Sequence, residues 1–135
     1  MPISSSTKPR SFVPVHTTTA QGELIILTLR PGSITLPDQI QDFNCELRAL
    51  ASKHPNVDAI IDFHQVPHIS LAALTQLIVF NNSIQLKGGM LQICGLSEEI
   101  RDLLLATGLN GLFCLQPDLR HAFARYEIAH DQSVA

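Results

Sequence analysis

Two apolar segments near the start of the chain have the pattern of neighbouring β-strands. Residues 12–19 and 23–29 are rich in β-branched and aliphatic side chains, and Gln21-Gly22 between them is typical of a tight turn. Pro14 cannot donate a hydrogen bond to a neighbouring strand, so the first segment is expected at an edge of the sheet. The chain is therefore predicted to begin its fold with a β-hairpin.

The next segment changes from strand-like to helical periodicity. Pro37 suits the first turn of a helix, and the apolar residues that follow are spaced three and four apart: Ile40, Phe43, Leu47 and Leu50. Pro55-Asn56 ends this helix. Residues 57–63 (VDAIIDF) then form an apolar run typical of a strand covered on both faces, which favours a parallel sheet.

The second half of the chain repeats the alternation of helix and strand. Ser97 is expected to cap a helix that Gly108 ends. The predicted elements are a helix over 70–87 stopped by Gly88-Gly89, a strand over 90–94, the Ser97 helix, a short strand over 112–115 and a closing helix over 118–130. This order predicts an α/β fold with right-handed crossovers.

The chain length of 135 residues fits one domain. Residues 1–10 are polar and rich in Ser and Pro, which predicts a flexible tail. We expect a single domain over residues 11–130 and a short C-terminal tail over 131–135.

Composition and charge exclude several classes of function. The net charge is −3 and no Lys or Arg cluster is present, so nucleic-acid binding is not expected. No apolar run is long enough for membrane insertion, and the first residues lack a secretory pattern, so a cytoplasmic location is expected. Cys45, Cys94 and Cys114 lie far apart among apolar neighbours, which favours buried free thiols.

The stretch HISLAALTQL, residues 68–77, has the features of a well-defined helix start. The Ser70 hydroxyl can cap the helix, and Ile69 and Leu74 have the spacing of a hydrophobic staple. The amides of a first helical turn favour an anion such as a phosphate. Geometry alone thus allows regulation or ligand binding at this point.

Three stretches together resemble the STAS domain of bacterial anti-sigma-factor antagonists: VDAIIDFHQVPHISLAALTQL, ICGLSEEIRDLLLATGLNGLF and DLRHAFA. The resemblance covers about residues 12–128. It implies a mixed sheet of about five strands packed against about four helices. It also implies a non-enzymatic regulatory module without a cofactor. In that family the domain docks on a serine-kinase anti-sigma factor, and phosphorylation of a serine in an Asp-Ser-Ser-Gly pattern releases the partner.

This chain departs from the family pattern at the residues of the switch. Ser70, Leu71, Ala72 and Ala73 match the Asp-Ser-Ser-Gly positions, so Ala72 stands at the phosphoacceptor position and has no oxygen to modify. Thr35 matches the acidic residue of a Gly-x-Leu-Asp pattern. Ser70 is an alternative phosphosite, although capping alone explains a serine there. The expected partner-binding residues are Thr35, His68, Ser70, Leu71, Ala72 and Ala73.

Leu71 has two interpretations, either a core residue or an exposed contact with a partner. His64 and His68 flank Pro67, but a loop with proline does not suit their spacing as metal ligands, so no metal site is expected. Asp62 has no catalytic partner motif beside it in sequence, so an enzyme is not expected.

Three functions are therefore compared. The favoured one is an antagonist-like module that binds a protein, with an anti-sigma factor as the first candidate partner and its phosphoswitch lost or altered. The others are an accessory subunit of a transporter or signalling scaffold, and a small-molecule or nucleotide binder. Self-association is left open.

Overall fold

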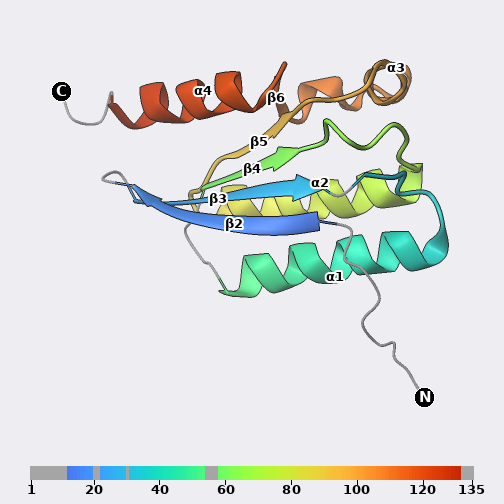
Figure 1. The fold of residues 1–135 in the computed structure, drawn as a ribbon, viewed down its shortest axis with the longest axis horizontal. Coiled ribbons are helices and arrows are strands. Elements are labelled where there is room, and N and C mark those ends of the chain that lie inside the picture. The colour runs from blue at the N-terminus through green and yellow to red at the C-terminus, as the bar shows by residue number, and fades with distance from the viewer. Residues whose placement is uncertain (1–11, 20–21, 30, 54–57, 132–135) are drawn as a thin grey trace.

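A mixed β-sheet with helices on both faces forms the domain (Figure 1). The computed structural model describes residues 12–19, 22–29, 31–53 and 58–131. The strands are β2 (Phe12–Thr19), β3 (Gly22–Leu29), β4 (Asp58–Asp62), β5 (Leu91–Cys94) and β6 (Cys114–Gln116). The helices are α1 (Pro37–Lys53), α2 (Leu71–Leu86), α3 (Glu98–Thr107) and α4 (Leu119–Asp131), with a 3-10 turn η1 (Leu109–Gly111). The α/β prediction is confirmed.

The strands lie in the order β2-β3-β4-β5-β6 within the described residues. β2 pairs antiparallel with β3, whereas β3 with β4, β4 with β5 and β5 with β6 are parallel. β2 is an edge strand of this sheet, as the proline at position 14 predicted. The parallel pairs place the carboxyl ends of β3, β4, β5 and β6 at one edge, where ligand and partner sites of α/β folds usually lie.

Two apolar cores lie on opposite faces of the sheet because successive strand side chains point to opposite sides. In β4, Ala59 and Ile61 belong to the larger core, which includes residues of α1 and α2. Ile60 belongs to a smaller core with Ala122 and Tyr126 of α4. Figure 1 shows α4 above the strands and α1 below them, with α2 behind β2 and β3 in this view.

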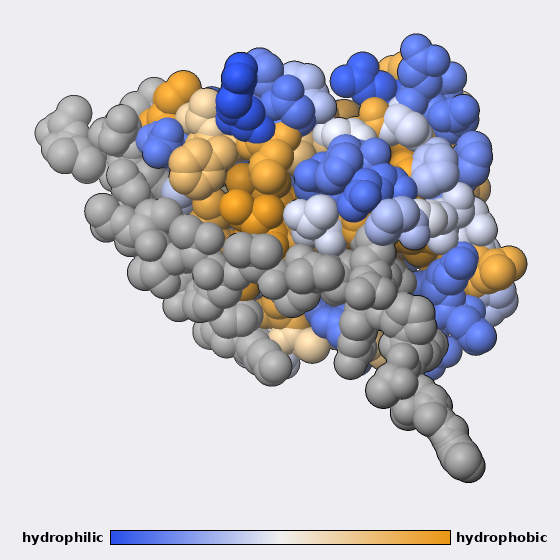
Figure 2. All heavy atoms as spheres, viewed as in Figure 1, coloured by the Kyte–Doolittle hydropathy of each residue, from blue (hydrophilic) through white to orange (hydrophobic). Residues whose placement is uncertain are grey.

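The smaller core is less completely covered than the larger one. Four of its apolar members are only partly buried, namely Ile26, Met90, Leu119 and Phe123. Figure 2 shows apolar surface gathered between α4 and the grey atoms on this side of the molecule. The buried Gln92 side chain bridges the layers, since its Nε2 donates to the Ala122 carbonyl at 2.8 Å.

The predicted helix ends are confirmed where capping residues define them. The Ser97 hydroxyl accepts a hydrogen bond from the Ile100 amide at 3.2 Å, and Gly108 ends α3 in the left-handed conformation with φ 73°. Gly88, with φ 84°, follows α2. The capping residues in the sequence therefore predicted these helix ends correctly.

Two predictions need correction. The last strand is Cys114–Gln116, displaced from the predicted 112–115, because Leu112 follows the 3-10 turn and its side chain is exposed. Cys45 is exposed on α1, whereas Cys94 is buried and Cys114 is partly buried. The helical period turns position 45 away from the core that Phe43 and Leu47 enter.

Several expectations fall outside the part of the chain that is described. These are the tail over residues 1–10, the turn residue Gln21, the helix-ending residues Pro55 and Asn56, and the last four residues. α4 itself extends to Asp131. Among the described helices, none combines the length and the apolar character that crossing a bilayer requires.

Candidate functional site

The start of α2 is capped as the sequence predicts. Ser70 has an extended backbone (φ −84°, ψ 164°), and its Oγ accepts a hydrogen bond from the Ala73 amide at 3.2 Å. The Leu74 amide donates to the Ser70 carbonyl at 3.0 Å. Ile69 and Leu74 are both buried in the larger core, which agrees with their expected role in setting the entry angle.

A second loop is joined to this helix start by backbone hydrogen bonds. Ile34 and Ile69 form an isolated parallel bridge, in which the Ile34 amide donates to the His68 carbonyl and the Ser70 amide donates to the Ile34 carbonyl, both at 3.0 Å. The Gly32 amide also donates to the Gln65 carbonyl at 3.1 Å. The segments 31–36 and 64–70, far apart in sequence, thus form one surface at the carboxyl edge of the sheet.

The first turn of α1 stabilises the same loop. Gln39 Oε1 accepts hydrogen bonds from the Thr35 amide at 3.1 Å and from the Leu36 amide at 3.0 Å. These bonds hold the segment before α1 in place, while the Thr35 and Leu36 side chains stay exposed to solvent. Hydrogen bonds to the loop backbone therefore order this segment and leave the Thr35 and Leu36 side chains available for contacts.

We define the α2-entrance surface as Thr35, Leu36, His68, Leu71 and Ala72, whose side chains are all exposed. Leu36 is 60% exposed and Leu71 is 53% exposed. The core interpretation of Leu71 is therefore wrong, and the exposed interpretation is confirmed. The exposure of Leu36 had no signal in the sequence beyond its place before a helix.

Two of the expected partner-binding residues do not belong to this surface. Ala73 is fully buried in the larger core, because the helical period turns position 73 inward one residue after Ala72. Ser70 is partly buried and its hydroxyl is engaged in the cap. The candidate surface keeps Thr35, His68, Leu71 and Ala72 from the original set and adds Leu36.

Hydroxyl groups near the helix start are used in local hydrogen bonds. Thr75 is exposed, but its Oγ1 donates to the Leu71 carbonyl at 3.0 Å. Ala72, at the family's phosphoacceptor position, has no hydroxyl group. The first turn of α2 also contains no acidic residue. The part of the α2-entrance surface that α2 contributes, Leu71 and Ala72, is therefore apolar and uncharged.

His64 and His68, considered together in the sequence, have different surroundings. His64 Nδ1 lies 2.9 Å from Asp62 Oδ2, and the His64 amide donates to Asp62 Oδ1 at 3.0 Å. His68 lies on the entrance surface and is exposed. Within the described ranges there is no cluster of three or more His, Cys, Asp or Glu side chains suited to a metal.

Asp62 lies beside an open hollow of about 510 Å³ on the α4 side of the sheet, which Gly95, Asp118 and Arg120 also line. The buried Cys94 thiol is close to this carboxylate. Burial, together with the negative charge of Asp62, raises the pKa of Cys94 to about 12. Near neutral pH the thiol stays protonated and is a poor nucleophile and metal ligand.

These features can be compared with known proteins. A family model described as STAS domain matches residues 18–125, which is most of the chain. The chain belongs to the STAS domain family. No curated protein sequence matches it. Family membership agrees with the resemblance seen in the sequence and with the mixed sheet described above.

Solved structures similar to this STAS domain have low sequence identity, and the likeness concerns the fold. An anti-sigma factor antagonist from Mycobacterium paratuberculosis is 18% identical, with a TM-score of 0.69, covering 87% of this chain and 96% of that one. A putative anti-sigma factor antagonist from Thermotoga maritima is 15% identical, with a TM-score of 0.67 and coverage of 83% and 92%. A sulfate transporter family protein from Wolinella succinogenes is 15% identical, with a TM-score of 0.67 and coverage of 93% of both chains.

Proposed function

We propose that this STAS domain is a non-enzymatic regulatory module that binds a protein partner through the α2-entrance surface. The observation that carries this proposal is the exposure of Leu36 and Leu71, at 60% and 53%, where backbone hydrogen bonds join the loop before α1 to the start of α2. An exposed apolar patch, unlike a single exposed apolar residue, marks a protein contact, and the hydrogen-bonded loops bring Leu36 and Leu71 to one surface where such a patch can form. An anti-sigma factor is the first candidate partner, because the similar structure from Mycobacterium paratuberculosis is an anti-sigma factor antagonist.

In this proposal, the position at which the family carries its phosphorylated serine does not act as a switch. Ala72 is exposed at the family's phosphoacceptor position and has no oxygen. Partner binding at this surface is therefore independent of phosphorylation at residue 72. Ser70 caps α2, and its hydroxyl oxygen already accepts a hydrogen bond from the Ala73 amide.

The test is affinity capture from the native cells with three tagged versions of the chain. The wild type is compared with Leu71→Arg on the entrance surface and with Ile128→Arg on α4. Ile128 is a matched control, since it is 52% exposed against 53% for Leu71. Quantitative mass spectrometry then identifies the retained proteins and maps any phosphorylated residues.

The expected result is a specific protein retained by the wild type and by Ile128→Arg and lost with Leu71→Arg. An anti-sigma factor among the retained proteins supports the antagonist-like role. A capture profile that Leu71→Arg leaves unchanged contradicts the proposed surface. Phosphorylation of Ser70 that abolishes capture contradicts the proposed role of Ser70 as a helix cap alone.

A second function is favoured by one of the comparisons. The similar Wolinella succinogenes structure is a sulfate transporter family protein. If this chain is an accessory domain of a transporter, the same capture experiment retains a membrane permease. The protein that the wild type captures and Leu71→Arg does not therefore distinguish the two functions. An anti-sigma factor indicates the first, and a membrane permease indicates the second.

A further inference from the structure

Two histidines in the described part of the chain are each held by an aspartate through both the backbone amide and the ring. His64 Nδ1 lies 2.9 Å from Asp62 Oδ2, and the His64 amide donates to Asp62 Oδ1 at 3.0 Å. His121 Nδ1 lies 2.7 Å from Asp118 Oδ1, and the His121 amide donates to the same oxygen at 2.9 Å. Because an ionised carboxylate only accepts hydrogen bonds, it fixes the ring proton on Nδ1. The lone pair of each neutral ring therefore lies on Nε2.

The two pairs differ in the burial of the aspartate. Both rings are 57% exposed, but the Asp62 side chain is 8% exposed against 57% for Asp118. A carboxylate that is shielded from water interacts more strongly with a charge on its partner. Asp62 can therefore stabilise a positive charge on the His64 ring better than Asp118 can on the His121 ring.

His64 also borders an open space that a reactant can enter. It lines the hollow of about 510 Å³ at the carboxyl edge of the sheet, together with Asp62, Asp118 and Arg120. The planar guanidinium group of an arginine suits the oxygen atoms of a phosphoryl group. Asp118 is the second carboxylate of this lining, and it is already engaged by His121. The hollow thus combines an accessible imidazole with a cation.

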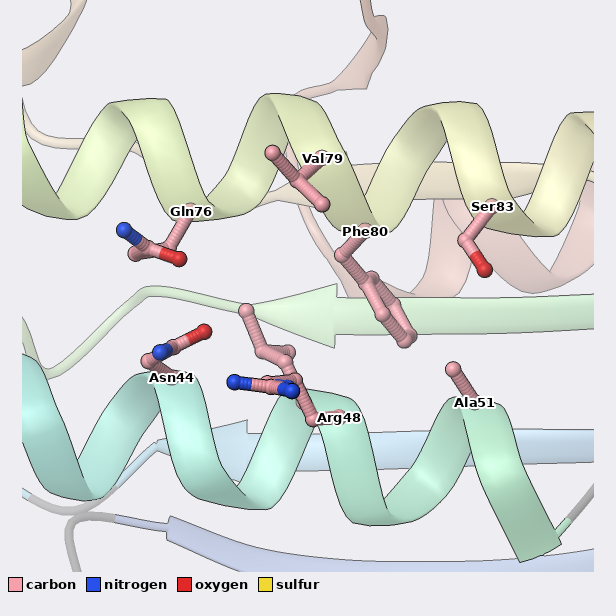
Figure 3. A pocket seen from close by; sticks show the side chains of 8 residues that line it. Asn44, Arg48, Ala51, Gln76, Val79, Phe80 and Ser83 are labelled. Atoms are coloured by element: carbon pink, nitrogen blue, oxygen red, sulfur yellow. The ribbon is translucent and has the colours of Figure 1, made fainter.

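The hollow between α1 and α2 offers no comparable chemistry. It has a volume of about 60 Å³. Figure 3 shows Val79 and Phe80 of α2 above Arg48 and Ala51 of α1 around it, and Arg48 is the one charged residue of its described lining. Reactive side chains therefore gather beside Asp62 and not on this helical face.

An exposed Nε2 lone pair can bind a metal or act as a nucleophile. A metal needs further ligands, and no group of three or more suitable side chains occurs in the ranges that the structure describes. A histidine oriented by a buried carboxylate is a known arrangement for reaction at Nε2. We propose that His64 is a phosphorylation site, whose Nε2 accepts a phosphoryl group from a phosphoramidate donor such as the phosphohistidine of another protein. Asp62 is its positioning residue.

The transfer balances with these groups alone. The Nε2 lone pair of His64 forms a bond to phosphorus while the bond from phosphorus to the protonated donor breaks, and its electron pair leaves with the donor nitrogen. The His64 ring gains a positive charge, and Nδ1–H shares it with the Asp62 carboxylate. Because one phosphorus–nitrogen bond replaces another, the donor is reactive enough to form the product.

This inference goes beyond the proposed function and does not depend on it. Ala72 cannot carry a phosphate, whereas His64 begins the segment 64–70 that also carries His68 of the α2-entrance surface. A phosphoryl group would add a charge of roughly −1.5 to −2 to this segment.

The experiment incubates the full chain with potassium phosphoramidate near pH 8. Peptide mass spectrometry at high pH, which preserves the phosphorus–nitrogen bond, measures the rate at each histidine, and phosphorus NMR identifies the modified ring nitrogen. The wild type is compared with Asp62→Asn and with Asp102→Asn, an exposed aspartate of α3 that does not line the hollow. Circular dichroism verifies folding, and nitrogen NMR reports which nitrogen of His64 carries the proton. The wild-type chain is also purified from its native cells at high pH.

In the wild type, His64 should react about tenfold faster than His68 and His121, because the buried carboxylate stabilises the charge that forms on its ring. His121 is the matched control, since its ring is equally exposed and its aspartate is not buried. Asp62→Asn should lower the rate at His64 to that of His68, and Asp102→Asn should leave it unchanged. The chain from native cells should carry phosphate on His64.

Three results would overturn the inference. The first is an equal rate at His64, His68 and His121 in the folded wild type, a comparison that does not require any variant to fold. The second is a rate at His64 that Asp62→Asn leaves unchanged. The third is a chain from native cells without phosphate on His64. None of these bears on partner capture by the α2-entrance surface, which is measured with Leu71→Arg.

Discussion

Gly95 packs directly against the carboxylate of Asp62. A Cβ atom at Gly95 would lie 2.8 Å from Asp62 Oδ1 and 2.9 Å from the His64 amide nitrogen, and the glycine has φ +72°. Its own amide donates to the Pro117 carbonyl at 3.2 Å. The chain segments that follow β4, β5 and β6 are thus brought together at one glycine at the carboxyl edge of the sheet.

Gly95→Ala should destabilise the domain by roughly 2 kcal/mol or more, because a left-handed conformation costs a non-glycine residue about 1–2 kcal/mol before any steric conflict. Gly111→Ala is the control, since a Cβ there meets nothing within 4 Å. Urea unfolding followed by circular dichroism measures both. Equal stability of the two variants would contradict the close packing of Gly95 on Asp62.

The two serine caps should differ in their contribution to stability. Ser70→Ala removes one capping bond and should lower the free energy of unfolding by about 1 kcal/mol. Ser97→Ala should cost more, because Ser97 Oγ also donates to the Pro67 carbonyl at 2.8 Å. Chemical denaturation of both variants gives the comparison.

Ser70→Ala should also retain the captured partner. A partner lost with this variant, while the fold is kept, would assign the Ser70 hydroxyl a direct role in binding. The same affinity capture used for Leu71→Arg provides this measurement.

The cysteines should differ sharply in reactivity toward iodoacetamide at pH 8. Cys45 is exposed and should be alkylated in the native protein. Cys94 is buried and its raised pKa, about 12, keeps the thiol protonated until the pH approaches that value, so it should react only after unfolding. Peptide mass spectrometry over a time course measures both sites. Rapid native alkylation of Cys94 would contradict its burial.

Gln92 should fasten α4 to the sheet. Gln92→Ala removes the buried hydrogen bond to the Ala122 carbonyl and leaves a cavity, so a loss of about 1–3 kcal/mol is expected. Hydrogen–deuterium exchange should accelerate in α4 before the larger core opens. Gln41→Ala is the control, because Gln41 is exposed on α1. Unchanged exchange in α4 would show that apolar contacts alone hold this helix.

The expected elements and their order agree with the structure because their signals are local. Ser97 and Gly108 define α3 through contacts within a few residues. The short last strand begins two residues later than predicted, because the 3-10 turn before it ends at Gly111 and Leu112 caps that turn. Elements whose ends depend on residues close in sequence were thus predicted correctly, whereas the short strand, which depends on its neighbours in the fold, was not.

The amino-acid sequence by itself determined the alternation of strands and helices, the caps and the likeness to STAS domains, because each depends on neighbouring residues. Only the tertiary structure decided which side of α2 faces the core, since the helix is uncharged throughout and apolar residues occur on both sides. That choice turns Ala73 inward and Leu71 outward. The parallel bridge of Ile34 with Ile69 likewise joins segments more than thirty residues apart, and a contact at that separation leaves no periodic pattern in the chain.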